Sequence, residues 1–344
     1  MRSYRTASLL LVAGLMLAST AEAEESSRVG KQISNFTLPD HFGNDHSLDD
    51  FSDAKVIVVA FLGTDCPLVK VYAPRLNELQ EQYADQGVQI LGINANRQDP
   101  ITKIGAFARK YEINFPMLKD ASNEVADAFD AIRTPEMFVL DENRVVRYWG
   151  RIDDQYGFGA GVGHGPSEVS RHDLCEAIDE VLAGKEVSVP VTEALGCIIG
   201  RIPKVEPHGE ITYAKHVAHI LQNRCVECHR EGEIGPFPLT SYEEVLGWGE
   251  MMTEVVEQRR MPPWYADPAH GEFANDARLT EEEIAIIRKW TDNGSPEGDP
   301  ADLPEPIEFT EGWAIPEPDL VLKMSDKPYT VQATGVVDYQ NFVV

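Results

Sequence analysis

The 344-residue sequence has little positive charge and few cysteines. Lys and Arg together number 30 against 57 Asp and Glu, which gives a formal net charge of −27 at pH 7. Phosphates are repelled by such an excess of negative charge, so we expect no nucleic-acid partner. Five cysteines are too few for a disulfide-built scaffold. Two of them form the motif described below, and the odd remainder, Cys66, Cys175 and Cys197, leaves at least one thiol free or exchanging.

Long apolar runs are equally scarce. The run Leu9–Leu17 (LLLVAGLML) follows Arg2 and Arg5 and precedes Ala-Glu-Ala at 21–23, which is the pattern of a secretory signal peptide cleaved after Ala23. An uncleaved anchor is the alternative, although the run is short for a bilayer. No other stretch is apolar enough to cross a membrane. With residues 1–23 as the signal peptide, we expect an exported protein, periplasmic or secreted, with no stable membrane insertion after cleavage.

Residues 24–200 show strands alternating with helices. The run Lys55–Leu62 (KVIVVAFL) is almost unbroken, apolar and rich in β-branched residues, as is typical of a buried central strand. We also expect helices at about 69–83, 101–111 and 171–182, a strand at 88–93, and a hairpin of 138–140 with 145–149. This order predicts an α/β unit with a mixed sheet covered on both faces.

The remainder of the chain divides at two proline-rich linkers. Pro203 and Pro207 mark the first, and the acidic segment 296–306 forms the second. Residues 201–300 between them are expected to be mainly helical. Residues 301–344 are interpreted as a linker followed by a short β segment. The sequence stops within an apolar strand pattern at 342–344, which favours a truncated sequence.

The segment Cys225-Val226-Glu227-Cys228-His229 carries the strongest chemical signal. Its spacing places two thiols one helical turn apart, as thioether attachment of a haem requires, and puts an imidazole next to the second thiol as an iron ligand. A thiol–disulfide pair or half of a zinc site are the alternatives. A zinc site would need a second Cys/His pair at ligand spacing, and none follows. The motif therefore predicts one covalent haem c, attached through Cys225 and Cys228 with His229 on the iron.

The residues around this motif also favour a haem unit. Apolar residues at 217, 220 and 221 predict an amphipathic helix leading into it. Thr280 to Glu283 forms a capping-box pattern ahead of a helix with Ile284, Ile287 and Trp290 on one face. Residues 210–298 thus resemble the cytochrome c family, in which the first and last helices cross over the haem.

The sixth iron ligand is open to several side chains. Met261 lies between the motif and the last helix, where the cytochrome c family has its axial methionine, and two prolines after it would stiffen the segment. Met251 and Met252 compete but sit in a helical pattern. A bis-histidine haem would use one of His216, His219 and His270.

A thiol site is indicated by Thr64-Asp65-Cys66-Pro67, which follows the central strand and precedes a helix. A thiol near a helix N-terminus ionises more readily because of the helix dipole. Arg133-Thr134-Pro135 comes directly before the hairpin. Residues 28–185 in this arrangement resemble the thioredoxin fold, whose cis-proline loop faces the reactive cysteine.

The resemblance points to one branch of that superfamily. Val69 occupies the position of the second cysteine of a thioredoxin-type dithiol, and Thr64 is one residue too close to Cys66 for a peroxiredoxin. What remains is similar to the one-cysteine, peroxiredoxin-like redoxins, which have Cys-Pro-x-Val-Lys and a later Gly-Cys-x-Ile, here Gly196–Ile199. The resemblance implies a redox-active Cys66 resolved by Cys197.

The predicted thiol site comprises Cys66, Cys197, Thr64, Arg133 and Pro135. We expect the positive charge of Arg133 to stabilise the thiolate. The alternative is that Cys66 is a buried, inert thiol, because apolar surroundings raise the pKa of a thiol. Cys175, which lies among apolar helix residues, is expected in the core.

Residues 313–344 resemble the start of the copper type II, ascorbate-dependent monooxygenases. No histidine follows His270, so the segment lacks the imidazole ligands of that copper site. The combined prediction is an exported oxidoreductase that joins peroxide or disulfide reduction by the thiol unit to single-electron transfer with redox partner proteins. The alternatives are a haem electron carrier whose thioredoxin-like unit only docks partners, and a haem sensor.

Overall fold

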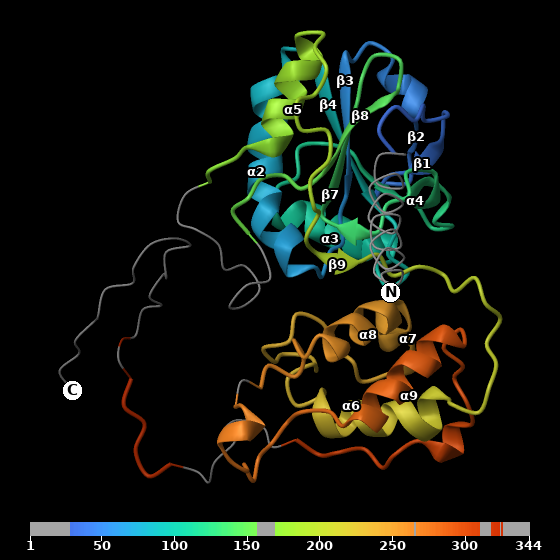
Figure 1. Cartoon of the computed structure of the whole chain (residues 1–344), viewed down its shortest axis with the longest axis vertical. Coiled ribbons are helices and arrows are strands. Elements are labelled where there is room, and N and C mark those ends of the chain that lie inside the picture. The colour runs from blue at the N-terminus through green and yellow to red at the C-terminus, as the bar shows by residue number, and fades with distance from the viewer. Residues whose placement is uncertain (1–27, 157–168, 265, 310–317, 324, 326–344) are drawn as a thin grey trace, which may run out of the picture.

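The computed structural model describes residues 28–156, 169–264, 266–309, 318–323 and 325 (Figure 1). The predicted signal peptide, and most of the segment compared with monooxygenases, lie outside the described residues. No helix within the described part of the chain is long and apolar enough to cross a membrane. Two units are seen in Figure 1: an α/β unit coloured blue to yellow-green, and a helical unit coloured yellow to red.

The α/β unit is built on a five-stranded sheet of order β5-β4-β3-β7-β8. Its strands are β3 (Val56–Phe61), β4 (Val88–Asn94), β5 (Met117–Lys119), β7 (Glu136–Leu140) and β8 (Val146–Gly150). The central strand β3 is buried along its whole length, as its apolar sequence predicts. It pairs in parallel with β4 and antiparallel with β7. The mixed sheet and the β7–β8 hairpin confirm the predicted α/β class.

Helices cover both faces of this sheet. They are α2 (Pro67–Ala84), α3 (Ile101–Lys110), α4 (Glu124–Ala128) and α5 (Asp173–Leu182). Alternate residues of β3 point to opposite faces, so Val56, Val58 and Ala60 join a core that includes α2, α3 and α5. Ile57, Val59 and Phe61 join a second core with α4. A 3-10 turn at Leu48–Phe51 and the small sheet of β1 (Thr37–Pro39) and β2 (Asp45–Ser47) complete the unit.

A second small sheet lies beside Cys66. β6 (Arg133–Thr134) pairs antiparallel with β9 (Cys197–Ile198), and Thr134 stands opposite Cys197. The sequence pattern did not predict these strands, because two residues are too few to show any periodicity. The pairing brings together segments more than sixty residues apart in the chain.

The helical unit contains the predicted helices on either side of the Cys225 segment. A π-helical turn (Tyr213–Val217) leads into α6 (Ala218–Arg224), and then come α7 (Tyr242–Val245), a 3-10 turn (Leu246–Trp248), α8 (Gly249–Glu257) and α9 (Glu281–Asp292), with further 3-10 turns at Pro268–His270 and Pro300–Asp302. The predicted capping box of α9 is present. Ile284, Ile287 and Trp290 are buried, as the helical spacing predicts.

The predicted β segment after residue 301 is not seen where it can be checked. Residues 318–323, the described part of the segment, contain no strand. A strand needs a partner that satisfies its backbone N–H and C=O groups. None of the strands described elsewhere in the chain pairs with these residues. Most of the predicted segment, residues 324 and 326–344, lies outside the described residues.

The two units contact each other where β9 lies near α8 (Figure 1). The backbone N–H of Ile198 donates to Met251 Sδ at 3.4 Å, and Arg133 Nη2 lies 2.7 Å from Glu254 Oε2. Packing is also close at Gly200, where a Cβ would fall 2.3 Å from the carbonyl oxygen of Gly247. Helix α8 is therefore seated directly against the strand that carries Cys197.

Candidate functional site

Cys66 occupies the N-cap position of α2. It follows the end of strand β3, at one end of the sheet. Pro67 is the first residue of the helix, a position where its missing backbone N–H costs no hydrogen bond. The residue is 1% exposed, and its Sγ donates to the carbonyl oxygen of Thr134 at 3.0 Å. The Thr134–Pro135 peptide bond is cis. The cis-proline loop thus lies against the cysteine, as the thioredoxin resemblance implies.

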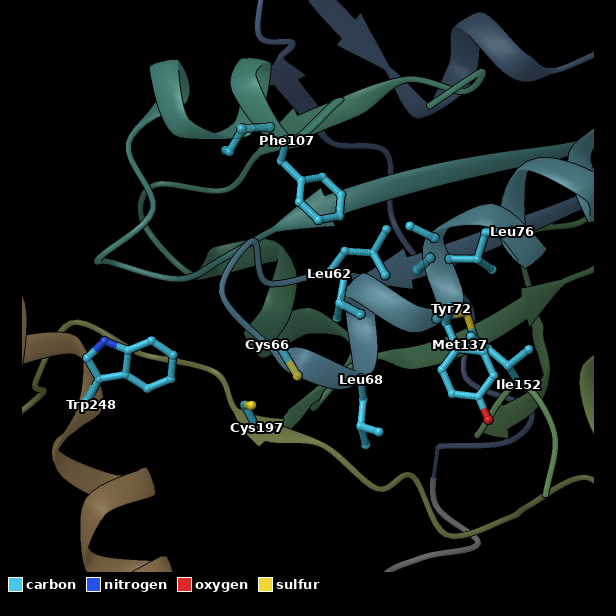
Figure 2. Packing of buried hydrophobic residues seen from close by; sticks show 14 of the residues in the cluster. Leu62, Cys66, Leu68, Tyr72, Leu76, Phe107, Met137, Ile152, Cys197 and Trp248 are labelled. Atoms are coloured by element: carbon cyan, nitrogen blue, oxygen red, sulfur yellow. The ribbon is translucent and has the colours of Figure 1, made fainter. Parts of the chain in front are cut away.

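Cys197 is the second sulfur of the site. Strand β9 holds it opposite Thr134, whose carbonyl accepts the Cys66 thiol, and Cys197 is 6% exposed. Figure 2 shows the side chains of Cys66 and Cys197 directed toward one another, with Trp248 of the helical unit nearby. Both are free thiols in this structure. The structure therefore brings together the two cysteines that the sequence pairs only by resemblance.

The two thiols differ in their readiness to ionise. Burial opposes ionisation of Cys66, but hydrogen bonds from the Cys197 thiol and from backbone N–H groups, including those of Val69 and Leu68, lower its pKa to about 7. The hydrogen bond to Cys66, together with burial, holds the pKa of Cys197 well above its ordinary value. The pair therefore loses its first proton from Cys66, and Cys197 keeps a proton that it donates to the Cys66 sulfur.

Thr64 is placed by a buried carboxylate. Its backbone N–H and its hydroxyl donate to the two oxygens of Asp99, at 3.0 and 2.6 Å. Asp99 is 0% exposed and also accepts from Asn94 at 2.9 Å and Asn96 at 3.0 Å. Lys103 Nζ lies 3.2 Å from it. The hydroxyl of Thr64 thus fixes the loop before Cys66.

The same network reaches the segment of Cys197. Asn96, which donates to Asp99, accepts the backbone N–H of Gly200 on its Oδ1 at 3.0 Å. The backbone N–H of Arg97 donates to the carbonyl of Gly200 at 2.7 Å. Asp99 and Asn96 therefore position both cysteine-bearing segments. The sequence pattern does not reveal their role, because polar residues after a buried strand are typical of an ordinary loop.

Arg133 contacts the backbone next to Cys197. Its Nη1 donates to the carbonyl of Gly196 at 3.0 Å, and its Nη2 pairs with Glu254 of α8. Its positive charge lowers the pKa of Cys197, as does that of Arg260. The dominant influences on Cys66 are burial and hydrogen bonds instead. The positive charge of Arg133 thus favours the thiolate of Cys197.

The remaining thiol of the α/β unit has a different environment. Cys175 on α5 is half-buried against the core, as expected. Burial and the charge of Asp179 raise its pKa. A neutral thiol is a poor nucleophile, so Cys175 serves as an internal reference for Cys66.

The Cys225–His229 segment follows α6 as a series of tight turns. Cys225 is half-buried and Cys228 is exposed. Burial, with the charge of Glu283, raises the pKa of Cys225 to about 12. The Cys225 thiol is therefore neutral near pH 7.

His229 is oriented by the backbone. Its Nδ1 lies 3.1 Å from the carbonyl oxygen of Phe237, to which it donates in the matching tautomer. Burial lowers the pKa of the imidazole, which keeps it neutral. This arrangement leaves the lone pair of Nε2 available to a metal, as in most histidine ligands. Within the described residues, no group of three or more His, Cys, Asp or Glu side chains is placed to hold a metal ion.

Met261 lines a separate cavity of about 550 Å³. The peptide bond between Met261 and Pro262 is cis. Trp264 and Thr280 line the same cavity, and the Trp264 Nε1 is buried without a hydrogen-bond partner among the described residues. His229 is not among the lining residues. The structure thus does not place the two predicted iron ligands on one cavity.

Comparison with known proteins identifies the first unit. Residues 29–149 match the AhpC/TSA family. The thiol-disulfide oxidoreductase ResA of Bacillus thuringiensis subsp. konkukian is 31% identical over 120 residues, which cover 35% of this chain and 68% of the relative. The chain belongs to the thioredoxin-like AhpC/TSA family. A second ResA, from Geobacillus kaustophilus, is 32% identical over 119 residues, or 35% of this chain and 67% of that protein.

The AhpC/TSA match has clear limits along the chain. It contains Cys66 and Arg133 to Pro135 but ends before Cys197 and the helical unit. Among solved structures, a hypothetical protein from Sinorhizobium meliloti is 34% identical with a TM-score of 0.46, covering 50% of this chain and 94% of that one. Because the family match ends before Cys197, the pairing of Cys66 with Cys197 is seen only in the structure of the present chain and not in the family match.

Proposed function

We propose that the AhpC/TSA unit is a thiol oxidoreductase in which Cys66 is the nucleophile and Cys197 the resolving thiol. The observation that carries the proposal is the meeting of two buried thiols at the cis-proline loop, with Cys66 bonded to the Thr134 carbonyl and Cys197 paired opposite Thr134. The Cys66 thiol has a pKa of about 7, so a large fraction of it is thiolate at neutral pH. The relatives named ResA are thiol-disulfide oxidoreductases, which supports the same class of chemistry.

The chemistry balances with either of two oxidants. The Cys66 thiolate attacks the terminal oxygen of a hydroperoxide, the O–O bond breaks, and the alcohol leaves with a proton while Cys66 becomes a sulfenic acid. The Cys197 thiolate then attacks the Cys66 sulfur, forming the disulfide and releasing water after protonation. With a disulfide substrate, Cys66 displaces one thiolate and Cys197 displaces the other. In both cases the substrate gains two electrons and the protein is left with one disulfide.

The test is the reactivity of Cys66 across pH. With iodoacetamide, we expect alkylation of the Cys66 peptide to rise with an inflection near pH 7. Cys175 in the same molecule should react only at higher pH. Hydrogen peroxide should produce a Cys66–Cys197 disulfide, measured by mass spectrometry, and Cys66→Ser should abolish it while Cys175→Ser does not. An inert Cys66 that reacts no faster than Cys175 would contradict the proposal.

We further propose that residues 201–300 carry one covalent haem c on Cys225 and Cys228, with His229 as an iron ligand. The neutral, backbone-anchored imidazole and the two adjacent thiols fit that group. Met261 is the proposed second ligand because of its place in the sequence between the motif and the last helix, and in this structure it lines a cavity that does not include His229. When bound, the iron would supply single-electron transfer. The residues of this chain attach it, orient the imidazole and keep that ring unprotonated.

The haem proposal is tested by absorption spectra of protein exported to a periplasm that attaches c-type haem. Reduced c-type bands that stay with the denatured chain would support it. A Met261→Ala variant that keeps the covalent haem but loses the methionine–iron charge-transfer band would support Met261. Protein without bound colour would leave Cys225 and Cys228 as ordinary thiols and would refute the proposal.

A further inference from the structure

A charged cluster joins the two units beside Cys197. Glu254 of α8 lies between two guanidinium groups: Arg133 Nη2 is 2.7 Å from its Oε2, and Arg260 Nη2 pairs with its Oε1. Arg133 comes from β6, whereas Arg260 follows α8 in the helical unit. Each of these three side chains is less than one-third exposed. The junction is therefore shielded enough for its charges to act over a few ångströms.

The cluster is attached to the backbone around Cys197 at two points. Arg133 Nη1 donates to the carbonyl of Gly196 at 3.0 Å, and the N–H of Ile198 donates to Met251 Sδ. These are the residues immediately before and after Cys197. Met251 and Glu254 are one turn apart on α8, so they lie on one face of that helix. Docking of α8 thus fixes both the strand and the guanidinium groups next to it.

We propose that Glu254 is a positioning residue of the thiol site, which gathers Arg133 and Arg260 beside Cys197 only when the helical unit is docked. The inference rests on the proposed thiol function and extends it, because a unit outside the AhpC/TSA match then takes part in the thiol chemistry. The charged and titratable groups recorded around Cys197 are Cys66 on the α2 cap, Arg133, Glu254 and Arg260. The guanidiniums favour the ionised form of Cys197, and that form carries out the second step of the reaction.

The physical reason for the carboxylate is that two guanidiniums repel each other. Without Glu254 they would separate toward water, which solvates an isolated cation better than a half-buried junction does. The expected consequence is selective. Attack by Cys66 depends on hydrogen bonds from Cys197 and the α2 N-terminus, so it is preserved. Resolution by Cys197 depends on the cluster, so it slows.

The experiment follows both steps in the full-length protein. A pulse of hydrogen peroxide is quenched with acid at successive times, and sulfenic acid and the Cys66–Cys197 disulfide are counted by mass spectrometry. For Glu254→Ala we expect sulfenic acid to form within about twofold of the wild-type rate, while the disulfide forms about tenfold more slowly at pH 7, which corresponds to a shift of about one pH unit in the resolving thiol. Raising the pH should restore the rate.

The matched control is Glu250→Ala, which removes an exposed carboxylate one turn before Glu254 on α8. It should behave as the wild type does. Glu254→Gln keeps the size of the side chain and one acceptor, and it should slow the disulfide step in the same direction. Unchanged or faster resolution in both Glu254 variants would overturn the inference. Wild-type protein that forms neither sulfenic acid nor disulfide would instead overturn the proposed function.

Discussion

The chain presents two pairs of cysteines in contrasting surroundings. Cys66 and Cys197 are buried, come from distant segments, and are held by hydrogen bonds of the folded backbone. Cys225 and Cys228 are close in sequence, lie in a series of turns, and are half-buried and exposed. The first pair is brought together by tertiary structure, whereas the second pair is close because of its spacing along the chain.

The difference extends to electrostatics. The fold lowers the pKa of one thiol in the first pair to about 7. In the second pair it raises the pKa of Cys225 to about 12, so that thiol is neutral near pH 7. Hydrogen bonds from the Cys197 thiol and from backbone N–H groups offset burial at Cys66, whereas Glu283 adds to the effect of burial at Cys225. Burial thus has opposite net outcomes at the two thiols because the neighbouring dipoles and charges differ.

The largest expected effect is the loss of covalent haem when the second pair, Cys225 and Cys228, is replaced. Replacing both Cys225 and Cys228 by alanine should abolish covalent haem completely, since no thioether can form. The pH profile of Cys66 alkylation should stay within about twofold of the wild-type profile, because its hydrogen-bond donors lie outside that segment. Absorption spectra of the denatured chain measure the first result. Retained covalent haem would show that the attachment site is elsewhere.

Replacing Asp99 tests how strongly the buried network holds the segments of Cys66 and Cys197. Asp99→Asn should cost about 3 kcal/mol in the free energy of unfolding, because it removes one member of a buried, charged network. Asp130→Asn, at an exposed carboxylate that pairs with Lys31, should cost less than about 0.5 kcal/mol. Urea unfolding followed by tryptophan fluorescence gives both values. Equal costs at the two sites would mean that the Asp99 network adds no special stability.

The same carboxylate predicts a pH dependence. Burial tends to raise the pKa of Asp99, but Lys103 and hydrogen bonds from Thr64, Asn94 and Asn96 lower it overall. A pKa lowered by folding adds stability that is fully present above the unfolded value, about 4, and is lost as the pH falls below it. Wild-type stability should therefore fall more steeply than that of Asp99→Asn on acidification below pH 4. Parallel curves would contradict this sign.

A smaller effect is expected on the alkylation rate of Cys66 when Cys197 is replaced. Cys197→Ala removes the thiol that donates to Cys66, so burial should raise the pKa of Cys66 and slow its alkylation at pH 7 about tenfold. Cys197→Ser keeps a hydroxyl donor at the same position and should stay nearer the wild-type rate. If the two variants react alike, the hydrogen bond is not what lowers this pKa.

The smallest expected effect concerns the helical unit. Thr280 accepts from the backbone N–H of Glu283, and Glu283 accepts from that of Thr280. Thr280→Ala should therefore destabilise α9 by about 1 kcal/mol, whereas Thr280→Ser should be nearly neutral. Urea unfolding followed by circular dichroism measures the difference. A neutral Thr280→Ala would show that packing of Ile287 and Trp290, rather than the cap, holds this helix.

Several elements were predictable because their signals are local. The strand at 56–61 and the helices at 67–84 and 281–292 follow from apolar periodicity and capping residues a few positions apart. The same holds for Cys66, which was placed at a helix N-terminus by the strand before it and the proline after it. The two-residue strands β6 and β9 gave no such signal, since each depends on a partner far along the chain.

The sequence by itself determined the α/β class, the position of Cys66 at the start of a helix, and the spacing of Cys225, Cys228 and His229. These depend on residues a few positions apart. Only the tertiary structure decided that Cys197 meets Cys66, that Asp99 anchors both segments, and that Arg133 faces Cys197 and Glu254. Such contacts join residues brought together by sheet pairing and by docking of the helical unit. Their energies depend on burial, which no local pattern specifies.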